Sequence, residues 1–159
     1  MNAPTSIPRP SGAFVFAAWA ALLAGTVVYC LGLWNARMAL NEKGYYFTVL
    51  VYALFSAVSL QKSVRDRLEG VPVTALYLGL CWLSLGLSML LVGVGLWNAE
   101  LAPSEKGFYA MSFVLCIFAA VAVQKNVRDV AGLAPSASPV PSREARAPRI
   151  ARDADNTAA

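Results

Sequence analysis

The sequence predicts an all-α membrane protein whose four transmembrane helices form two tandem, parallel-repeat helical hairpins. Three observations lead to this fold class: four long apolar runs, a second half that nearly copies the first, and basic residues placed beside the ends of the runs. Hydrophobic residues make up 58% of the 159 residues and charged residues only 14%. Soluble domains are about 45–50% apolar and about 25% charged, so the chain departs from them in both directions, as membrane proteins do.

The predicted spans cover residues 13–34, 44–60, 73–97 and 107–123, and none of them contains Asp, Glu, Lys, Arg or His. Apolar runs of about 18 residues or more are typical of membrane-spanning helices. Barrel strands are shorter and alternate apolar with polar residues, so these continuous runs favour helices. The second and fourth runs are short for a hydrocarbon core of about 30 Å. We therefore expect their helices to continue through residues 61–66 and 124–129.

Five segments follow from this pattern. They are a short cytoplasmic N-terminus (1–12), a first two-helix repeat (13–66), a cytoplasmic linker (67–72), a second two-helix repeat (73–129) and a cytoplasmic tail (130–159). The tail is rich in Ala, Pro, Ser, Arg and Asp. Such a segment cannot bury enough apolar surface to offset the entropy of ordering, so we expect it to be disordered.

The basic residues predict the orientation. The side that holds both termini and the 67–72 linker carries ten Lys and Arg, and the opposite side carries three. Without the four Arg of the far tail the ratio is still six to three. Because cytoplasmic loops are enriched in Lys and Arg, both termini are predicted to be cytoplasmic. Acidic residues dilute the basic tail, so no nucleic-acid partner is expected.

The repeat appears when the chain is compared with itself at an offset of 63 residues. Residues 32–66 and 95–129 share 19 identities in 35 positions without a gap. Three motifs recur in order: G-L-W-N-A, E-K-G and Q-K-x-V-R-D. Since each copy holds an even number of spans, both copies enter the membrane in the same direction. Such parallel repeats are related by an axis along the membrane normal.

These motifs, at these spacings, resemble the YiaA/YiaB family of bacterial inner-membrane proteins, which is defined by a repeated two-helix domain. The resemblance covers residues 12–129. It implies a location in the bacterial inner membrane, and it implies no activity, substrate or catalytic residue.

The Q-K-x-V-R-D copies are the sharpest polar feature, and they supply one set of candidate contact residues: Gln61, Lys62, Arg65, Asp66, Gln124, Lys125, Arg128 and Asp129. Residues four apart share a helix face, which places Gln61 over Arg65 and Lys62 over Asp66. Two interpretations remain open. The segments anchor the spans at the lipid headgroups, or they form a paired cytoplasmic surface that binds a protein or anionic lipid.

A second set of candidate contact residues lies in the loops predicted to face the periplasm: Trp34, Asn35, Glu42, Lys43, Trp97, Asn98, Glu105 and Lys106. The tryptophans are expected at the membrane interface. Asn41 and Ser104 are predicted N-caps, each followed by a glutamate at the positive end of its helix dipole. Alternatively, the two carboxylates pair with Arg37 or with the lysine of the other repeat, or the Trp-Asn pairs contact a ligand.

Small residues recur four apart in the first three spans, and close helix packing in lipid is their expected role. They are Ala17, Ala21, Gly25, Ala53, Ala57, Ser84 and Ser88.

The chemistry that is missing from the sequence limits the function. His is absent, and the three cysteines lie inside spans, where a free thiol behaves as a small apolar group. No metal, cofactor or nucleophile–base pair is therefore expected, and the chain is predicted not to be an enzyme. The preferred reading is a structural or interaction protein of the cell envelope that contacts lipids and a second copy or another membrane protein. The alternative is a small oligomeric passive channel or exporter along a Ser/Thr-lined path.

Overall fold

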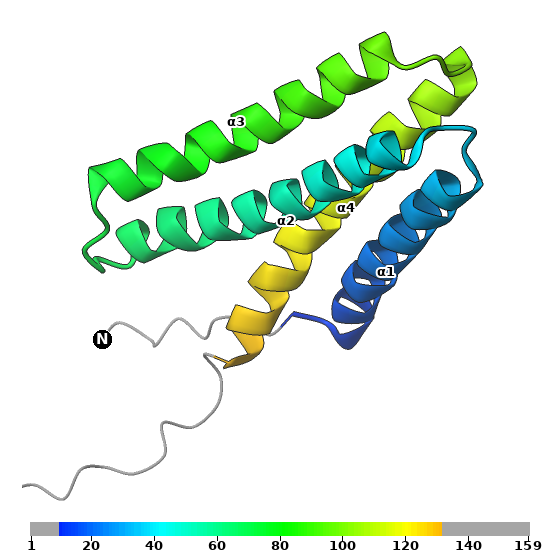
Figure 1. Cartoon of the computed structure of the whole chain (residues 1–159). Helices are drawn as coiled ribbons and strands as arrows, with labels where there is room; N and C mark the ends of the chain where they lie inside the picture. The colour runs from blue at the N-terminus through cyan, green and yellow to red at the C-terminus, as the bar shows by residue number, and fades with distance from the viewer. Residues whose placement is uncertain (1–9, 132–159) are drawn as a thin grey trace, which may run out of the picture.

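The computed structural model describes residues 10–131, which form four helices joined by short connections (Figure 1). Their bounds are Gly12–Asn35 for α1, Leu40–Leu68 for α2, Ala75–Asn98 for α3 and Pro103–Ala131 for α4. Each is long and apolar enough to cross a membrane, which confirms the predicted spans. Residues 1–9 and 132–159, which include nearly all of the predicted N-terminal segment and tail, lie outside the described residues.

The second helix of each repeat continues beyond its apolar run, as expected from the thickness of the membrane. α2 runs through its Q-K-x-V-R-D segment to Leu68, and α4 runs through the corresponding segment to Ala131. Gly70, at a φ of 78°, adopts the left-handed conformation that ends the turn after α2. These extensions carry the charged motifs as ordered helix rather than as loop.

The predicted N-caps of the second and fourth helices are wrong. α2 begins at Leu40 and α4 at Pro103, so Asn41 and Ser104 lie inside the first turn. Pro103 suits the first position of α4 because an N–H there would have no partner within the helix, so its absence costs nothing. The φ of proline is also already helical. Both helices start two residues earlier than N-caps at Asn41 and Ser104 would place them.

The helices of one repeat pack mainly on the helices of the other. α1 lies against α4 and α2 lies against α3, whereas the sequence neighbours α1 and α2, and likewise α3 and α4, touch only slightly. α2 and α4 also contact each other, and Figure 1 shows α4 crossing behind α2. Each repeat is thus a hairpin only in the order of its helices along the chain. In space, each helix packs mainly on a helix of the other repeat, an arrangement that we call exchanged packing. A twofold relation between two parallel repeats produces this reciprocal pairing.

The core follows a regular seam on the central pair of helices. Buried residues recur on α2 and α4 at steps that alternate between three and four residues: Tyr46, Val49, Ala53, Ser56, Leu60 and Ser63, with their repeat equivalents Tyr109, Ser112, Cys116, Ala119, Val123 and Asn126. This is the spacing that keeps one face of a helix against a partner over its full length. α2 and α4 are thus the central helices, and α1 and α3 are the peripheral ones.

Aromatic rings fill the end of the core next to the α1–α2 and α3–α4 loops. The Tyr46 and Tyr109 rings stack with centroids 6.3 Å apart, and Tyr29 meets Tyr109 edge to face at 5.7 Å. The Tyr29 hydroxyl is fully buried and donates to the Tyr46 carbonyl oxygen at 3.2 Å. Rings in these arrangements add about 0.5–1.5 kcal/mol per pair beyond their burial.

Two glycines permit the exchanged packing. A Cβ on Gly32 would lie 2.7 Å from a ring carbon of Phe108, and a Cβ on Gly95 would lie 2.8 Å from a ring carbon of Tyr45. The Tyr45 hydroxyl also donates to the Leu91 carbonyl oxygen at 2.7 Å, which fixes its ring over α3. The first residue of each G-L-W-N-A motif is therefore explained by a ring from the other repeat.

The small-residue prediction holds only in part. Ala53 and Ala57 of α2, Gly25 of α1 and Ser88 of α3 are buried. Ala17 is exposed, and the packed face of α1 instead includes Ala18. The predicted series on α1 therefore reaches the packed face at Gly25, while its first member, Ala17, lies one position away from that face.

Candidate functional site

The two Q-K-x-V-R-D segments lie together at one end of the bundle, which we call the Arg–Asp end. There Arg65 Nη1 lies 3.2 Å from Asp129 Oδ1, and Arg128 Nη1 lies 3.3 Å from Asp66 Oδ1. Each arginine thus pairs with the aspartate of the other repeat, so the ion pairs are reciprocal. The predicted placement of Lys62 over Asp66 does not describe this contact, because Asp66 turns toward Arg128.

Glu69 joins the two ion pairs into one network. Its carboxylate accepts a hydrogen bond from Arg65 Nε at 2.8 Å and from Arg128 Nη2 at 3.0 Å. The side chains are partly exposed, with relative accessibilities of 19% for Asp66 and 46% for Glu69. Exposed pairs contribute only about 0.2–1 kcal/mol each, and a network of ordered arginines contributes more than an isolated pair. The arginines of the motif are therefore largely neutralised inside the protein.

The lysines of the same motif are left at the surface. Lys62 and Lys125 are exposed, and neither takes part in an ion pair within residues 10–131. Five basic and three acidic residues lie in the described parts of 61–69 and 124–131, so this end carries two excess positive charges. A groove of about 670 Å³ opens beside Lys125 between α2, α3 and α4, with Gln61 and Arg65 also among its lining residues.

Sequence reasoning missed Asn126, which occupies the variable third position of the second Q-K-x-V-R-D copy. Its side chain is 1% exposed, and neither amide atom has a hydrogen-bond partner within the described residues. At the equivalent position of the first repeat, Ser63 Oγ donates to the Ser59 carbonyl oxygen at 2.7 Å. A buried amide in a seam of regular spacing favours one register of the helices. The sequence signal for this residue was that the second repeat carries the larger polar Asn126 where the first repeat carries Ser63.

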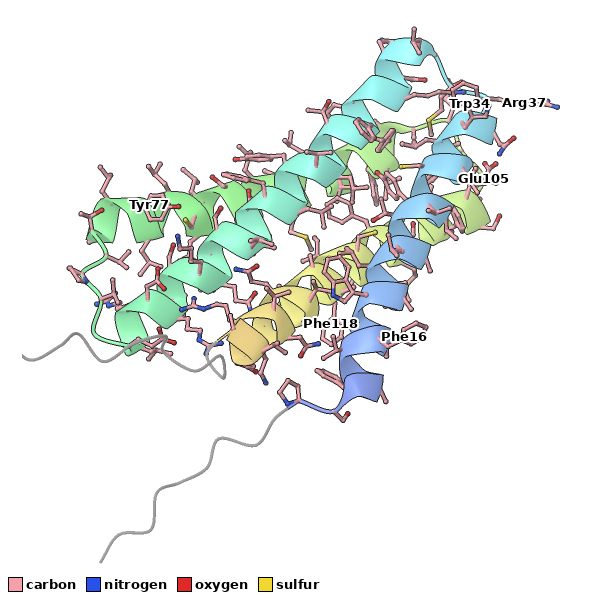
Figure 2. The ribbon with its side chains drawn as sticks, turned by 90° about the horizontal axis from the view of Figure 1, so that it is seen from below. Phe16, Trp34, Arg37, Tyr77, Glu105 and Phe118 are labelled. Atoms are coloured by element: carbon pink, nitrogen blue, oxygen red, sulfur yellow. The ribbon has the colours of Figure 1, made fainter. Side chains whose placement is uncertain are left out.

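The opposite end, which we call the Trp–Asn end, is built from the other two motifs. Figure 2 shows Trp34, Arg37 and Glu105 gathered there. Glu42 Oε2 accepts a hydrogen bond from the Ala39 N–H at 2.9 Å, and Glu105 Oε2 accepts one from the Ala102 N–H at 2.9 Å. Each glutamate thus satisfies a backbone donor that would otherwise lack a partner at the start of its own helix.

The lysine and asparagine of these motifs close the end of the preceding helix. Lys43 Nζ donates to the Trp34 carbonyl oxygen at 2.9 Å, and Lys106 Nζ donates to the Trp97 carbonyl oxygen at 3.2 Å. Asn35 and Asn98 each donate from Nδ2, at 2.8 Å, to the carbonyl oxygen four residues earlier. All four bonds satisfy carbonyl groups in the last turn of a helix. The lysines therefore bond within their own repeat rather than across the bundle.

The described residues offer little for acid–base, nucleophilic or metal chemistry. No group of three or more His, Cys, Asp or Glu side chains close enough to hold a metal ion occurs in residues 10–131. Cys81 Sγ lies 3.6 Å from Ser63 Oγ, and Cys116 Sγ lies 3.8 Å from Thr26 Oγ1. A hydroxyl group is not a base, so neither contact activates the thiol as a nucleophile.

The chain matches known proteins over both repeats. The family described as the yiaA/B two helix domain matches residues 14–66 and again residues 77–129. The chain is 58% identical to the inner membrane protein YiaA of Escherichia coli over 125 residues, which cover 79% of this chain and 86% of that protein. It is 27% identical to the inner membrane protein YiaB of the same organism over 95 residues, 59% of this chain and 80% of that protein.

A shorter relative corresponds to little more than one repeat. The uncharacterized membrane protein YubF of Bacillus subtilis is 37% identical over 68 residues, which are 42% of this chain and 78% of that protein. No solved structure matches the chain. The double match, the four apolar helices and the high identity to a full-length relative agree with one another: this is a multi-pass membrane protein that belongs to the YiaA/YiaB two-helix domain family and carries that domain twice.

Proposed function

We propose that this chain is a non-enzymatic interaction protein of the bacterial inner membrane, with its docking surface at the Arg–Asp end. Two of the relatives are named inner membrane proteins, which supports the location. The observation that carries the proposal is that the charged residues of the Q-K-x-V-R-D motifs fall into two groups, one paired within the protein and one exposed. The arginines and aspartates hold the repeats together, whereas Lys62 and Lys125 remain exposed to a partner.

The proposed partner is an acidic segment of another membrane protein at the cytoplasmic surface. The two excess positive charges at this end attract such a segment, and the groove beside Lys125 adds apolar contact area, with Trp82 and Leu85 in its lining. Anionic lipid headgroups compete for the same lysines, since each basic residue near an anionic surface contributes about 1 kcal/mol.

The proposal places both termini and the Arg–Asp end in the cytoplasm, following the excess of Lys and Arg on that side. A reporter enzyme that folds only in the periplasm, fused to the C-terminus, is expected to stay inactive. The same reporter inserted in the α1–α2 loop is expected to be active. The reversed pair of results would contradict this orientation.

The interior of the chain supports an interaction role better than a conducting one. A Ser/Thr-lined path needs hydroxyl groups that face an open lumen. Ser56, Ser88 and Ser112 are instead buried, and each donates to a carbonyl oxygen of its own helix at 2.7 Å. Hydroxyls bonded in this way offer little to a passing solute.

Site-specific photo-crosslinking in intact cells tests the proposed surface. A photoreactive phenylalanine analogue at Val64 or Val127, half-exposed positions beside the lysines, is expected to give discrete protein adducts. Matched controls at Phe55 and Phe118, which are 70% and 72% exposed and occupy equivalent positions of the two repeats, are expected to give none.

Charge reversal then tests the role of the lysines. The double substitution Lys62→Glu and Lys125→Glu is expected to reduce the adducts at Val64 at least fivefold without changing the amount of protein in the membrane. Equal adducts at all four positions, or adducts that survive the reversal, would exclude a lysine-dependent docking surface.

A further inference from the structure

Two glycines of the repeated motifs have no role inside the protein. Gly44 and Gly107 are the last residues of the two E-K-G motifs, and both lie within helices. An added Cβ would meet nothing within 4 Å at either position, in contrast to Gly32 and Gly95. A glycine in a helix costs about 0.5–1 kcal/mol relative to alanine. Packing within the chain therefore does not explain why both repeats carry glycine here.

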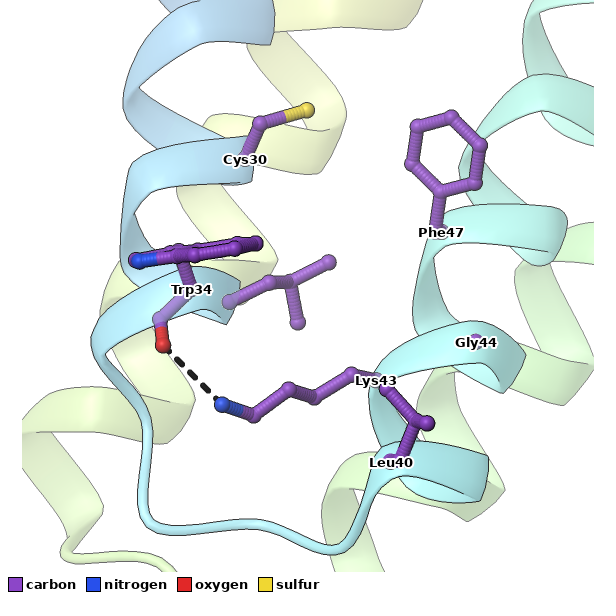
Figure 3. Close-up of a pocket in the computed structure, with 7 residues that line it drawn as sticks. Cys30, Trp34, Leu40, Lys43, Gly44 and Phe47 are labelled. Atoms are coloured by element: carbon purple, nitrogen blue, oxygen red, sulfur yellow. Dashed lines mark hydrogen bonds between the residues drawn. The ribbon is translucent and has the colours of Figure 1, made fainter.

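Each glycine lines its own groove, which the exchanged packing leaves open between the two helices of its repeat. Because α1 leans on α4, it diverges from α2, and a groove of about 560 Å³ remains between them near their connecting loop (Figure 3). Its lining includes Cys30, Trp34, Lys43, Gly44 and Phe47. The corresponding groove between α3 and α4 measures about 530 Å³. Its lining includes the equivalent Trp97, Lys106 and Gly107, with the smaller Gly93 and Ala110 at the positions of Cys30 and Phe47.

Each groove combines an apolar bed with one cation at its mouth. Figure 3 shows Cys30 and Phe47 on facing helices, with Lys43 reaching across toward Trp34 at the loop end. The ammonium group uses one of its three N–H donors on the Trp34 carbonyl oxygen, which leaves two donors for a ligand. Trp34 is 82% exposed, as expected for a residue at the level of the lipid headgroups.

The length of the groove and the charge of its lysine indicate what kind of molecule binds there. The α2 wall of the first groove runs from Leu40 to Phe47, about 10 Å at a rise of about 1.5 Å per residue, whereas a transmembrane helix of a second copy would pack along the whole core of about 30 Å. A short apolar trough that ends at an ammonium group instead fits the upper part of an acyl chain whose phosphate lies at the membrane interface.

We propose that each repeat binds one glycerophospholipid from the leaflet at the Trp–Asn end, with an acyl chain against Gly44 or Gly107 and the phosphate on Lys43 or Lys106. The glycines let the chain lie directly on the helix backbone, and the lysine selects a phosphate-bearing lipid. This site lies at the opposite end of the bundle from the lysines of the docking surface and does not depend on it.

Native mass spectrometry of the purified full-length protein, titrated with phosphatidylglycerol, tests the proposal. The wild type is expected to retain two tightly bound lipids, Gly44→Leu one, and the double variant Gly44→Leu, Gly107→Leu none. The matched control, Gly79→Leu with Gly86→Leu, fills open space on the exposed side of α3 and is expected to keep both lipids. Two retained lipids in the groove-filled double variant would overturn the proposal.

The phosphate contact is tested separately. Lys43→Gln with Lys106→Gln is expected to weaken phosphatidylglycerol binding about tenfold, and diacylglycerol, which lacks the phosphate, is expected to bind the wild type at least tenfold more weakly than phosphatidylglycerol. Equal binding of the two lipids would overturn the role of the lysines. A wild-type dimer that dissociates when the grooves are filled would assign them to a second copy of the chain instead.

A measurement on the wild type covers the case in which the leucine variants do not fold. Cys30 lines the first groove and is partly exposed, whereas Cys81 and Cys116 are buried. Alkylation of Cys30 in lipid-free detergent is expected to slow about fivefold on addition of phosphatidylglycerol. An unchanged rate at a concentration that saturates the protein would refute occupancy of the groove.

Discussion

Gly95→Leu is expected to lower the free energy of unfolding by about 2–4 kcal/mol. Even a Cβ at this position would lie 2.8 Å from a ring carbon of Tyr45 and 3.2 Å from Tyr46, so the rings or the helices must move apart. Tyr46 is 4% exposed and Tyr45 is hydrogen-bonded to Leu91, so neither ring shifts freely. Overpacking of this kind costs about 1–3 kcal/mol, and separating α2 from α3 removes further contacts.

The matched control is Gly86→Leu on the same helix. Gly86 is exposed and has open space around it, so its substitution is expected to cause no loss of stability and to raise it by at most about 1 kcal/mol, since a helix loses a glycine. Reversible unfolding in mixed micelles measures both variants. Adding Tyr45→Ala to Gly95→Leu is expected to recover part of the loss, since the ring that clashes is removed. Equal stability of the Gly95 and Gly86 variants would show that α2 and α3 do not approach as closely as described.

The helices and the repeat were predictable because their signals are local or internal to the sequence. The four apolar runs have no charges, and the recurrence of motifs such as Q-K-x-V-R-D reveals the duplication without any structural knowledge. Helix extension past the apolar runs followed from the thickness of the membrane. The structure agrees with these predictions at Leu68 and Ala131, where α2 and α4 end.

The exchange of helices between repeats was not predictable from hydropathy. In a membrane, the face toward lipid is as apolar as the face toward the core, so the pattern does not tell α1 whether to pack on α2 or on α4. The spacing from Tyr46 to Ser63 was present in the sequence, but exposed Phe47 and Phe55 on the same helix conceal it. The wrong assignment of Ala17, which is exposed next to the buried Ala18, has the same cause.

For the candidate sites, too, the sequence revealed some features and not others. The residues of the repeated motifs were identified, but their partners were not, because contacts such as Arg65 with Asp129 join positions 64 residues apart. Capping by Glu42 depends on where α2 begins, and α2 begins two residues earlier than an N-cap at Asn41 would place it. The grooves at Gly44 and Gly107 exist only because of the exchanged packing, so no local sequence pattern indicates them.

Arg128→Gln is expected to destabilise the protein by about 1–2 kcal/mol. Arg128 binds Asp66 and Glu69 together, and its loss leaves two neighbouring carboxylates without this cation. Each partly exposed pair contributes about 0.2–1 kcal/mol, and the repulsion between the two carboxylates adds to the loss. The control is Lys125→Gln, one turn away and exposed, which is expected to have almost no effect because Lys125 belongs to no ion pair within the described residues.

A double-mutant cycle separates the pairing from the general loss of charge. Asp66→Asn in the Arg128→Gln background is expected to cost less than Asp66→Asn in the wild type, by about 0.5–1 kcal/mol, since the bond it removes is already broken. The difference should shrink at high salt because these groups are partly exposed. Additive losses would mean that the two segments lie near each other without interacting. A measured coupling would make the Arg–Asp network the element that ties the second helices of the two repeats together, and would leave the exposed lysines free to bind a partner.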